Sequence, residues 1–226
     1  MALTEVTGQS DKHIHWFSPN MGIHHDVVEP WRKLCKAAAE QGFDLAIASG
    51  FRSFERQLAI WNKKCSGQLT IKDIDNEQVD INELSSEDVV KAILTFSALP
   101  GASRHHWGTD IDFYDKSALP SEQTLQLEPW EYQENGPFSE LTNWLKQHAH
   151  VYGFYFPYDK YRGGIAAEPW HLSYFPIAKH YEKQLTIATL TSCLQSSDII
   201  NRSLILEKLS TIYAQYIFNI GHFNYG

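Results

Sequence analysis

The sequence predicts an α+β fold, in which helices pack on a small antiparallel sheet and a helical C-terminal extension follows. Three observations predict it. Apolar residues recur at helical spacings of three and four in residues 26–42 and 53–67. Residues 108–114 alternate apolar and polar side chains, which is a strand period. Residues 177–222 contain no proline and almost no glycine, which favours helices.

The individual elements follow from caps, periods and breakers. Asp26 and Ser53 are candidate caps of the first two helices, and Gly42 and Gly67 lie where those helices should end. Residues 1–25 read as irregular and residues 68–84 as a polar surface insertion. The other expected elements are a strand at 43–48, a helix capped by Ser86, a loop at 115–136, a helix at 138–151, strands at 152–156 and 170–174, and two C-terminal helices broken near Ser196.

The chain has 226 residues, which fits one domain with an addition or at most two. We expect a domain at residues 1–176, including the irregular N-terminal segment, and a helical extension at 177–226 packed on it. The extension could also form a dimer or cover a substrate cleft, and the sequence leaves the oligomeric state open.

Composition excludes several classes. The net charge of −8, the pI of about 5.7 and the lack of a Lys/Arg cluster argue against a nucleic-acid partner. No apolar run reaches the roughly 18 residues of a membrane span. Cys35, Cys65 and Cys193 are too far apart for a C-x-x-C motif and read as buried or half-buried thiols. The first residues carry no secretory signal, so the chain as written is expected in the cytoplasm, or outside it if a signal was removed.

Three segments carry candidate chemistry: residues 49–57, 103–112 and 168–171. A catalytic zinc uses three protein ligands and keeps a position open for water. His105, Asp112 and His171 would supply two imidazoles and a carboxylate. Glu168 would be the free carboxylate that accepts a proton, provided that the chain bends at Pro169.

Arg52 lies at a strand-to-helix junction, where a guanidinium could stabilise an oxyanion. Each of these segments also has a structural interpretation. A single histidine among 11 is usually a packed or surface residue, Arg52 could be a surface charge, and Trp107 and Trp170 are better explained by packing.

Taken together, the segments form a more specific pattern: an arginine, then S-x-H-x-x-G-x-x-x-D, then E-x-W-H. In this order the chain resembles the M15 zinc peptidases, and in particular D-alanyl-D-alanine carboxypeptidases of the VanY type, over about residues 26–176. The motif from Phe154 through Gly163-Gly164-Ile165 to His171 looks especially VanY-like.

The resemblance implies roles for seven residues. It implies that zinc is held by His105, Asp112 and His171, that Glu168 is the catalytic base, and that Arg52 polarises the carbonyl. It further implies that Ser103 and Gln57 lie near the substrate. The implied partners are peptidoglycan stem peptides or muropeptides.

Two residues depart from the family pattern. Asp110 stands where a small residue is usual, and it shares a strand face with Asp112. We expect Asp110 to point to solvent, although a second carboxylate near the metal would alter metal preference. His106 adds an imidazole beside a ligand position. Separately, His13 and His15 would share one face of a strand and could form a metal pair, although a flexible or core-capping segment is the favoured interpretation.

The sequence therefore favours a zinc-dependent D,D-carboxypeptidase that removes terminal D-Ala from stem peptides. The alternatives are an L-Ala-D-Glu endopeptidase of the endolysin kind, a D-Ala-D-Ala dipeptidase, and a non-catalytic zinc-containing binding module. The endopeptidase differs from the carboxypeptidase in whether the pocket binds a free C-terminal carboxylate. Arg162 is a candidate for binding a free C-terminal carboxylate. Zinc itself is not certain from the ligands, since two histidines and a carboxylate also bind other divalent ions.

Overall fold

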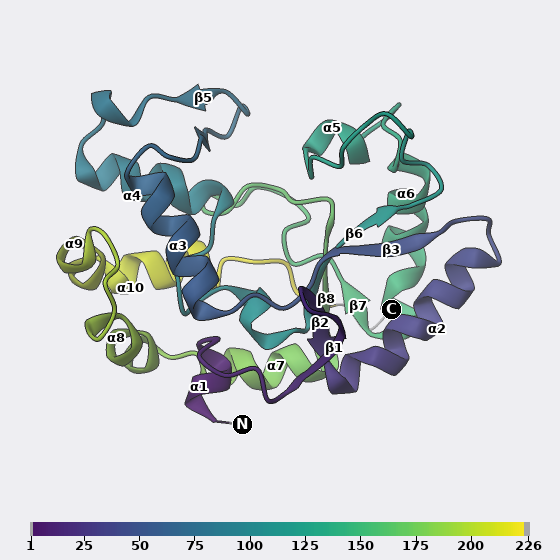
Figure 1. Ribbon diagram of the computed structural model, residues 1–226, viewed down its shortest axis with the longest axis horizontal. Coiled ribbons are helices and arrows are strands. Elements are labelled where there is room, and N and C mark those ends of the chain that lie inside the picture. Colours follow the sequence, from purple (N-terminus) through teal and green to yellow (C-terminus); the bar gives the residue numbers. More distant parts are fainter. Residues whose placement is uncertain (1, 224–226) are drawn as a thin grey trace.

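A four-stranded antiparallel sheet lies at the centre of the computed structural model, which describes residues 2–223 (Figure 1). The strand order is β3 (Leu45–Ser49), β6 (Asp110–Asp115), β8 (His171–Tyr174) and β7 (Phe154–Tyr155). The mixed fold with a small antiparallel sheet, predicted from the sequence, is confirmed.

The two faces of this sheet differ in chemistry, as its register requires. Ile111 of β6 pairs with Leu172 of β8, and both side chains are fully buried in an apolar cluster. Asp112 pairs with His171 in the same register, one residue along each strand. Because side chains alternate along a strand, these two polar groups lie on the opposite face from the apolar pair. The sheet therefore supplies a core on one side and a polar site on the other.

The remaining elements are helices and two small hairpins, β1–β2 and β4–β5. The N-terminal half contains α1 (Leu3–Val6), β1 (Ile14–Ser18), β2 (Met21–His24), η1 (His25–Val27), α2 (Val28–Ala39), α3 (Phe54–Cys65), β4 (Ile71–Lys72), β5 (Gln78–Val79), η2 (Ile81–Glu83), α4 (Ser86–Phe96) and η3 (Arg104–Trp107). The C-terminal half contains α5 (Pro129–Tyr132), α6 (Ser139–His148), η4 (Ala149–Tyr152), α7 (Phe175–Gln184), α8 (Ile187–Gln195), α9 (Arg202–Glu207), α10 (Leu209–Ile212) and the π-helical turn η5 (Tyr213–Ile217).

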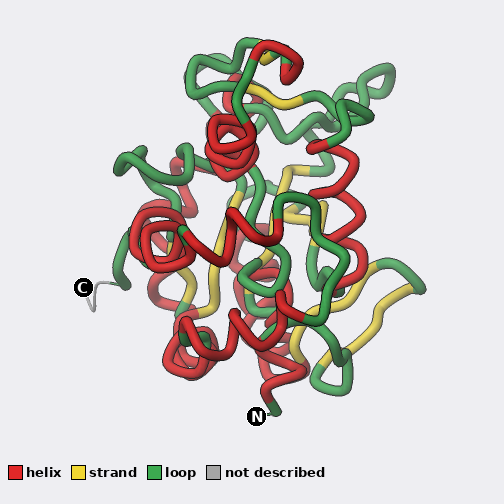
Figure 2. Tube along the Cα trace, turned by 90° about the vertical axis from the view of Figure 1, so that its left-hand side faces the viewer, coloured by secondary structure: helices red, strands yellow, loops and turns green. Residues whose placement is uncertain are grey.

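Two apolar clusters hold these elements together. One joins α2 and α6 to the apolar face of the sheet, with Trp31, Phe113 and Leu141 among its members. The other joins α3 and α4 to the C-terminal helices, and Trp61 and Leu190 are fully buried in it. Figure 2 looks onto the side of the molecule where these C-terminal helices lie. Residues after 177 thus share a core with α3 and α4, while the domain boundary at residue 176 stays a prediction.

Several predicted elements need correction. Residues 2–25 are not irregular, because they contain α1 and the β1–β2 hairpin. Ser53 caps α3 as predicted, but α4 is capped by Ser85 rather than Ser86. The first expected C-terminal helix is split at Leu185 and Thr186, where the Thr186 side chain caps α8. The last two misplacements arise where side-chain caps rather than periodicity set the boundary.

Two expectations about the whole chain can be compared with the structure. Cys35 and Cys65 are half-buried and Cys193 is buried, and all three are free thiols, as predicted. Within residues 2–223, no helix combines the length and the apolar character that crossing a bilayer requires.

Candidate active site

His105, Asp112 and His171 meet at one point on the polar face of the sheet. Their potential ligand atoms all lie within 4.8 Å of one another, and all three residues are buried. Asp112 and His171 face each other across β6 and β8. His105 lies on η3, which ends at Gly108 in a left-handed conformation with φ 66°, a geometry that favours glycine. This turn leads the chain directly into β6, so both side chains reach the same point.

Hydrogen bonds select one nitrogen of each imidazole for the site. Nδ1 of His105 lies 2.9 Å from the carbonyl oxygen of Gly50, which leaves Nε2 at 3.4 Å from Asp112 Oδ2. His171 is turned the other way: its Nε2 lies 2.9 Å from Asp110 Oδ1, and its Nδ1 lies 3.1 Å from Asp112 Oδ1. Ligating histidines in proteins are oriented by such partners on the other nitrogen.

The chemistry of this donor set fits a divalent cation. Nδ1 of His171 and Oδ1 of Asp112 are buried and lack an aligned hydrogen bond, although they face each other. Burial disfavours the charged form of His171, but its close contacts with the carboxylates of Asp110, Asp112 and Glu168 outweigh that effect and raise the pKa of His171 well above its usual value. The surrounding carboxylates therefore favour positive charge at Nδ1. A metal cation at this point would take the place of that proton.

Asp110 is not exposed, and the expectation that it points to solvent is wrong. Its side chain is fully buried and accepts hydrogen bonds from Thr109 and Ser173. Burial alone would raise its pKa, but the Arg104 guanidinium 2.7 Å away and the contact with His171 lower it. Asp110 is thus an ionised group that orients His171 rather than a surface charge.

Glu168 lies beside the three ligand residues because the chain turns at Pro169. The backbone N–H of His171 donates to the Glu168 carbonyl oxygen at 3.1 Å, which closes the turn. The Glu168 carboxylate then lies 3.4 Å from His171 Nδ1 and is largely buried. Its backbone N–H donates to the carbonyl oxygen of Tyr158. The bend that the sequence required is therefore present, and a carboxylate faces the ligand group.

Arg52 follows β3 and reaches into the same pocket. Its Nη1 donates to Gln57 Oε1 at 3.0 Å, and Gln57 donates in turn to the carbonyl oxygen of Ala98. Burial lowers the pKa of Arg52, and the negative charges of Asp112 and Glu168 oppose that change. Ser103 lines the pocket, whereas Gln57 is fully buried behind Arg52. Of the two predicted substrate contacts, only Ser103 is on the pocket wall.

His106 does not compete with His105 for the site. It faces the other side of η3, where Nδ1 lies 2.6 Å from the Arg52 carbonyl oxygen and Nε2 accepts from the backbone N–H of Gly101. Burial lowers the pKa of His106 to about 3, so it is neutral. Both nitrogens are occupied by structural hydrogen bonds, and His106 serves to join η3 to the segment that carries Arg52.

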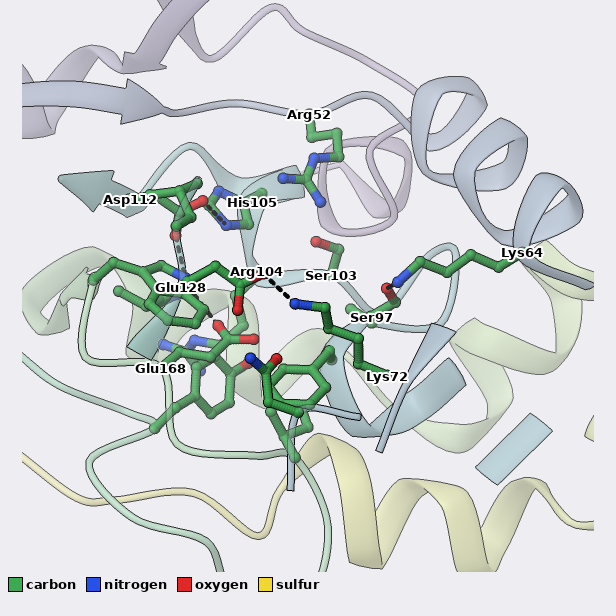
Figure 3. Close-up of a pocket in the computed structure, with 18 of the residues that line it drawn as sticks. Arg52, Lys64, Lys72, Ser97, Ser103, Arg104, His105, Asp112, Glu128 and Glu168 are labelled. Atoms are coloured by element: carbon green, nitrogen blue, oxygen red, sulfur yellow. Dashed lines mark hydrogen bonds and ion pairs between the residues drawn. The ribbon is translucent and has the colours of Figure 1, made fainter. Parts of the chain in front are cut away.

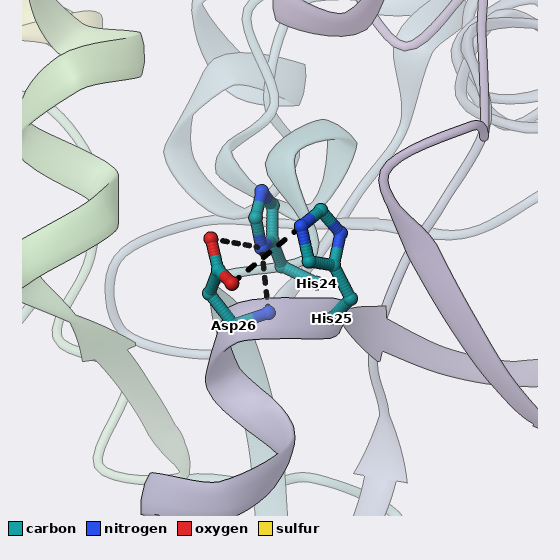
Figure 4. A group of neighbouring side chains, drawn as sticks. All are labelled: His24, His25 and Asp26. Atoms are coloured by element: carbon teal, nitrogen blue, oxygen red, sulfur yellow. Dashed lines mark hydrogen bonds and ion pairs between the residues drawn. The ribbon is translucent and has the colours of Figure 1, made fainter.

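The alternative of a metal pair formed by His13 and His15 is not supported. His13 is buried before β1 begins, while His15 is exposed on it, so the two rings do not share a face. His24, His25 and Asp26 instead form a second group with ligand atoms within 4.8 Å (Figure 4). There, Nδ1 of His24 accepts from the Asp26 backbone N–H, which is a helix-start hydrogen bond.

The three ligand residues line a cavity of about 350 Å³, and this cavity is also lined by charged residues that the sequence did not predict (Figure 3). This is at the small end of ligand pockets in general. Lys64 of α3 lines it, with Nζ 2.6 Å from Ser97 Oγ. Lys72 at the end of β4 forms an ion pair with Glu128 at 2.6 Å, which joins the β4–β5 hairpin to the start of α5 at the pocket. Lys64 could have been found from its spacing of seven residues from Gln57, which places both on one face of a helix.

The candidate carboxylate-binding residue Arg162 is elsewhere. Its Nη1 lies 2.6 Å from Asp159, and the side chain does not line the cavity.

Comparisons with known proteins identify the family. Residues 20–177 match the VanY family, described as D-alanyl-D-alanine carboxypeptidase. An uncharacterized protein of Haemophilus influenzae is 35% identical over 125 residues, which are 54% of this chain and 95% of that protein.

Two solved structures share the fold. VanYB in complex with D-alanine-D-alanine has a TM-score of 0.54 and 22% identity, covering 84% of this chain and 92% of that one. A mutant of the vancomycin-resistance D,D-pentapeptidase VanY in complex with Zn(II) has a TM-score of 0.52 and 21% identity, covering 78% and 93%.

The fold, the buried ligand set and the match over most of the length define a member of the M15 peptidases. The chain belongs to the VanY family.

Proposed function

We propose that this protein is a zinc-dependent D,D-carboxypeptidase that removes the terminal D-Ala from peptidoglycan stem peptides. The observation that carries the proposal is the convergence of His105, Asp112 and His171 with the carboxylate of Glu168, 3.4 Å from His171 Nδ1, in a small pocket. A ligand triad with a free carboxylate beside it is the arrangement that metal-dependent hydrolysis requires. The family match supports the substrate class.

His105, Asp112 and His171 would hold the metal. Zinc bound there would supply a Lewis acid that polarises a carbonyl group and makes water more acidic. The chain's own residues do the rest. Asp110 and the Gly50 carbonyl oxygen keep the two imidazoles in their ligating orientation.

Glu168 is proposed as the general base and then the general acid. It would accept a proton from the attacking water and deliver it to the leaving amine of the terminal D-Ala. Its carboxylate is held by the turn at Pro169, so it needs no rearrangement to face the ligand residues. Positioned acid–base groups contribute roughly 10²–10⁴-fold to rate.

Arg52 is proposed to stabilise the oxyanion that develops on the scissile carbonyl. Its guanidinium lines the same pocket and is supported by Gln57, which we therefore propose to act through Arg52 rather than on the substrate. Ser103, on the pocket wall, is proposed to contact the peptide directly.

A mass-spectrometric digest tests the proposal. Purified protein with added zinc is incubated with stem pentapeptides, tetrapeptides and intact muropeptides, beside Glu168→Ala. Glu55→Ala, which changes an exposed glutamate of α3, serves as the control. We expect loss of one D-Ala from the pentapeptide, a decrease of roughly 10²–10⁴-fold in Glu168→Ala, and unchanged zinc content in both variants.

Other products would point to other functions. Cuts within the stem would indicate an endopeptidase. Release of D-Ala-D-Ala from a larger peptide, or cleavage of the free dipeptide D-Ala-D-Ala, would indicate dipeptidase chemistry. Bound zinc without any product would favour a binding module. Near-normal turnover in Glu168→Ala would refute the proposed role of this carboxylate.

A further inference from the structure

We propose that Lys64, together with the Ser97 hydroxyl, forms the subsite that binds the free C-terminal carboxylate of the peptide. This inference rests on the proposed carboxypeptidase function and adds the group that would distinguish it from an endopeptidase. It assigns the binding of a terminal carboxylate to Lys64 and Ser97. The sequence suggests Arg162 for this role, but Arg162 does not line the pocket.

The position of Lys64 follows from the face of α3 on which it lies. Gln57 and Lys64 are seven residues apart, about two helical turns, and therefore project from the same side. Both reach the segment after α4: Gln57 donates to the Ala98 carbonyl oxygen at 2.7 Å, and Lys64 donates to Ser97 Oγ at 2.6 Å. The Lys64 ammonium is thereby held at the pocket wall rather than free in solvent.

Among the described residues that line this pocket, Lys64 is the cation without a contacting carboxylate or a supporting amide. Arg104 is neutralised by Asp110 and Glu182, each at 2.7 Å. Lys72 is paired with Glu128 at 2.6 Å. For Lys64, no carboxylate of residues 2–223 lies within ion-pair distance, and its contact is the neutral Ser97 hydroxyl.

The partly buried ammonium has a desolvation cost that its surroundings do not offset. Burial is the main effect on Lys64 and lowers its pKa, while the charge of Glu168 acts in the opposite direction and Arg52 adds to the lowering. A carboxylate bound beside Nζ would compensate that cost, because a charge-assisted hydrogen bond replaces lost hydration. The site therefore favours an anion over a neutral group.

The direction from the metal ligands to Lys64 matches the order of groups in the substrate. In Figure 3, Arg52 and Ser103 lie between the ligands His105 and Asp112 on one side and Lys64 with Ser97 on the other. With the scissile carbonyl at Arg52, the Cα atom of the leaving D-Ala lies about 3.8 Å beyond the Cα atom of the residue before it, and the free carboxylate is attached to it. A carboxypeptidase substrate thus places its negative charge on the Lys64 side of Arg52. An endopeptidase substrate would place a neutral amide there.

Paired peptide substrates test the inference. Stem peptides ending in D-Ala-D-Ala are prepared with a free carboxylate and with a C-terminal amide, and kcat/KM is measured for both. In the wild type we expect the acid to be preferred by about 10- to 100-fold, the worth of a hydrogen bond between charged groups. Lys64→Met, which keeps the apolar stem, should lose most of that preference through a higher KM for the acid.

Two variants serve as controls. Lys64→Arg retains a cation and should recover part of the acid preference. Lys63→Met removes the neighbouring exposed lysine, which does not line the pocket, and should leave the preference at the wild-type value. Because the readout is a ratio of two substrates, a general loss of folding or of metal lowers both rates and leaves the ratio unchanged.

The outcomes separate this inference from the function on which it rests. A wild type that cleaves neither peptide contradicts the proposed function. A wild type that removes D-Ala from the acid, with the same acid preference in Lys64→Met, overturns the Lys64 subsite and leaves the carboxypeptidase assignment standing. Equal rates on acid and amide in the wild type likewise overturn the subsite.

Discussion

Replacing Asp110 with alanine tests whether this buried carboxylate orients a metal ligand and balances a buried cation. The substitution removes the hydrogen bond to His171 Nε2 at 2.9 Å and the ion pair to Arg104 at 2.7 Å. Arg104 is only 4% exposed, and its remaining carboxylate partner is Glu182. Two separate quantities should therefore change: the free energy of unfolding and the affinity for zinc.

The magnitudes follow from these contacts. Breaking a buried ion pair from one side costs about 3–5 kcal/mol, and we expect the lower end because Glu182 still contacts the guanidinium. Loss of the partner that orients a ligating histidine lowers metal affinity about 10- to 100-fold. The stability loss should shrink when Arg104→Met is combined with Asp110→Ala, since the uncompensated charge is then removed.

The assay combines denaturant unfolding of the metal-free protein with a competitive zinc titration. Asp115→Ala is the matched control: Asp115 is a buried carboxylate on the same strand that accepts from the Asp44 and Ser117 backbone N–H groups, away from the metal ligands. It should lower stability without changing zinc affinity. A zinc affinity for Asp110→Ala within about twofold of the wild type would refute the orienting role.

Three further predictions concern groups around the site. Gln57→Leu removes the hydrogen bond to Arg52 Nη1 and should lower kcat by up to about 100-fold, with zinc affinity unchanged, as measured by steady-state kinetics and zinc titration. Gln215→Leu removes the 2.5 Å hydrogen bond from the π-helical turn η5 to the Gly163 carbonyl oxygen, which lies in the loop that leads to Glu168. The substitution should lower the free energy of unfolding by about 1 kcal/mol and should also lower kcat. Burial is the main effect that lowers the pKa of His24 to about 4, and the charges of His25 and His13 add to it. Below pH 6.5, the usual pKa of a histidine, the unfolded chain therefore takes up a proton at His24 that the folded protein excludes. The contribution of His24 to stability should therefore fall by up to about 2 kcal/mol between pH 8 and pH 5, so the loss measured by denaturant unfolding should be smaller in His24→Gln than in the wild type by about that amount.

Each of these three has a contradicting result. An unchanged kcat in Gln57→Leu would show that Arg52 is positioned without it. A normal kcat in Gln215→Leu, despite lower stability, would make the C-terminal turn a purely structural support. An identical pH dependence in wild type and His24→Gln would mean that His24 accepts a proton in the folded state. Gln195→Leu, at the exposed end of α8, is the control for the two glutamine variants.

The sequence was sufficient where the signal is local or contained in a motif. The periods of α2 and α3, the strand at Asp110–Asp115 and the cap at Ser53 depend on neighbouring residues, and they lie close to where they were expected. The spacing around His105, Gly108 and Asp112 also requires a turn into a strand, which the structure contains. Local pattern failed at residues 1–25, because the β1–β2 hairpin is paired within a segment that shows no clear alternation.

By itself, the sequence determined the fold class, the candidate ligands and their resemblance to a peptidase family, because each depends on residue identity and short spacing. Only the tertiary structure decided what surrounds them. Asp110 is buried against His171, 61 residues away, because the register of β6 and β8 places it there. Lys64 faces the pocket because the face of α3 packs against the segment after α4. Burial and long-range partners determine the charge and role of such groups, and sequence spacing contains neither.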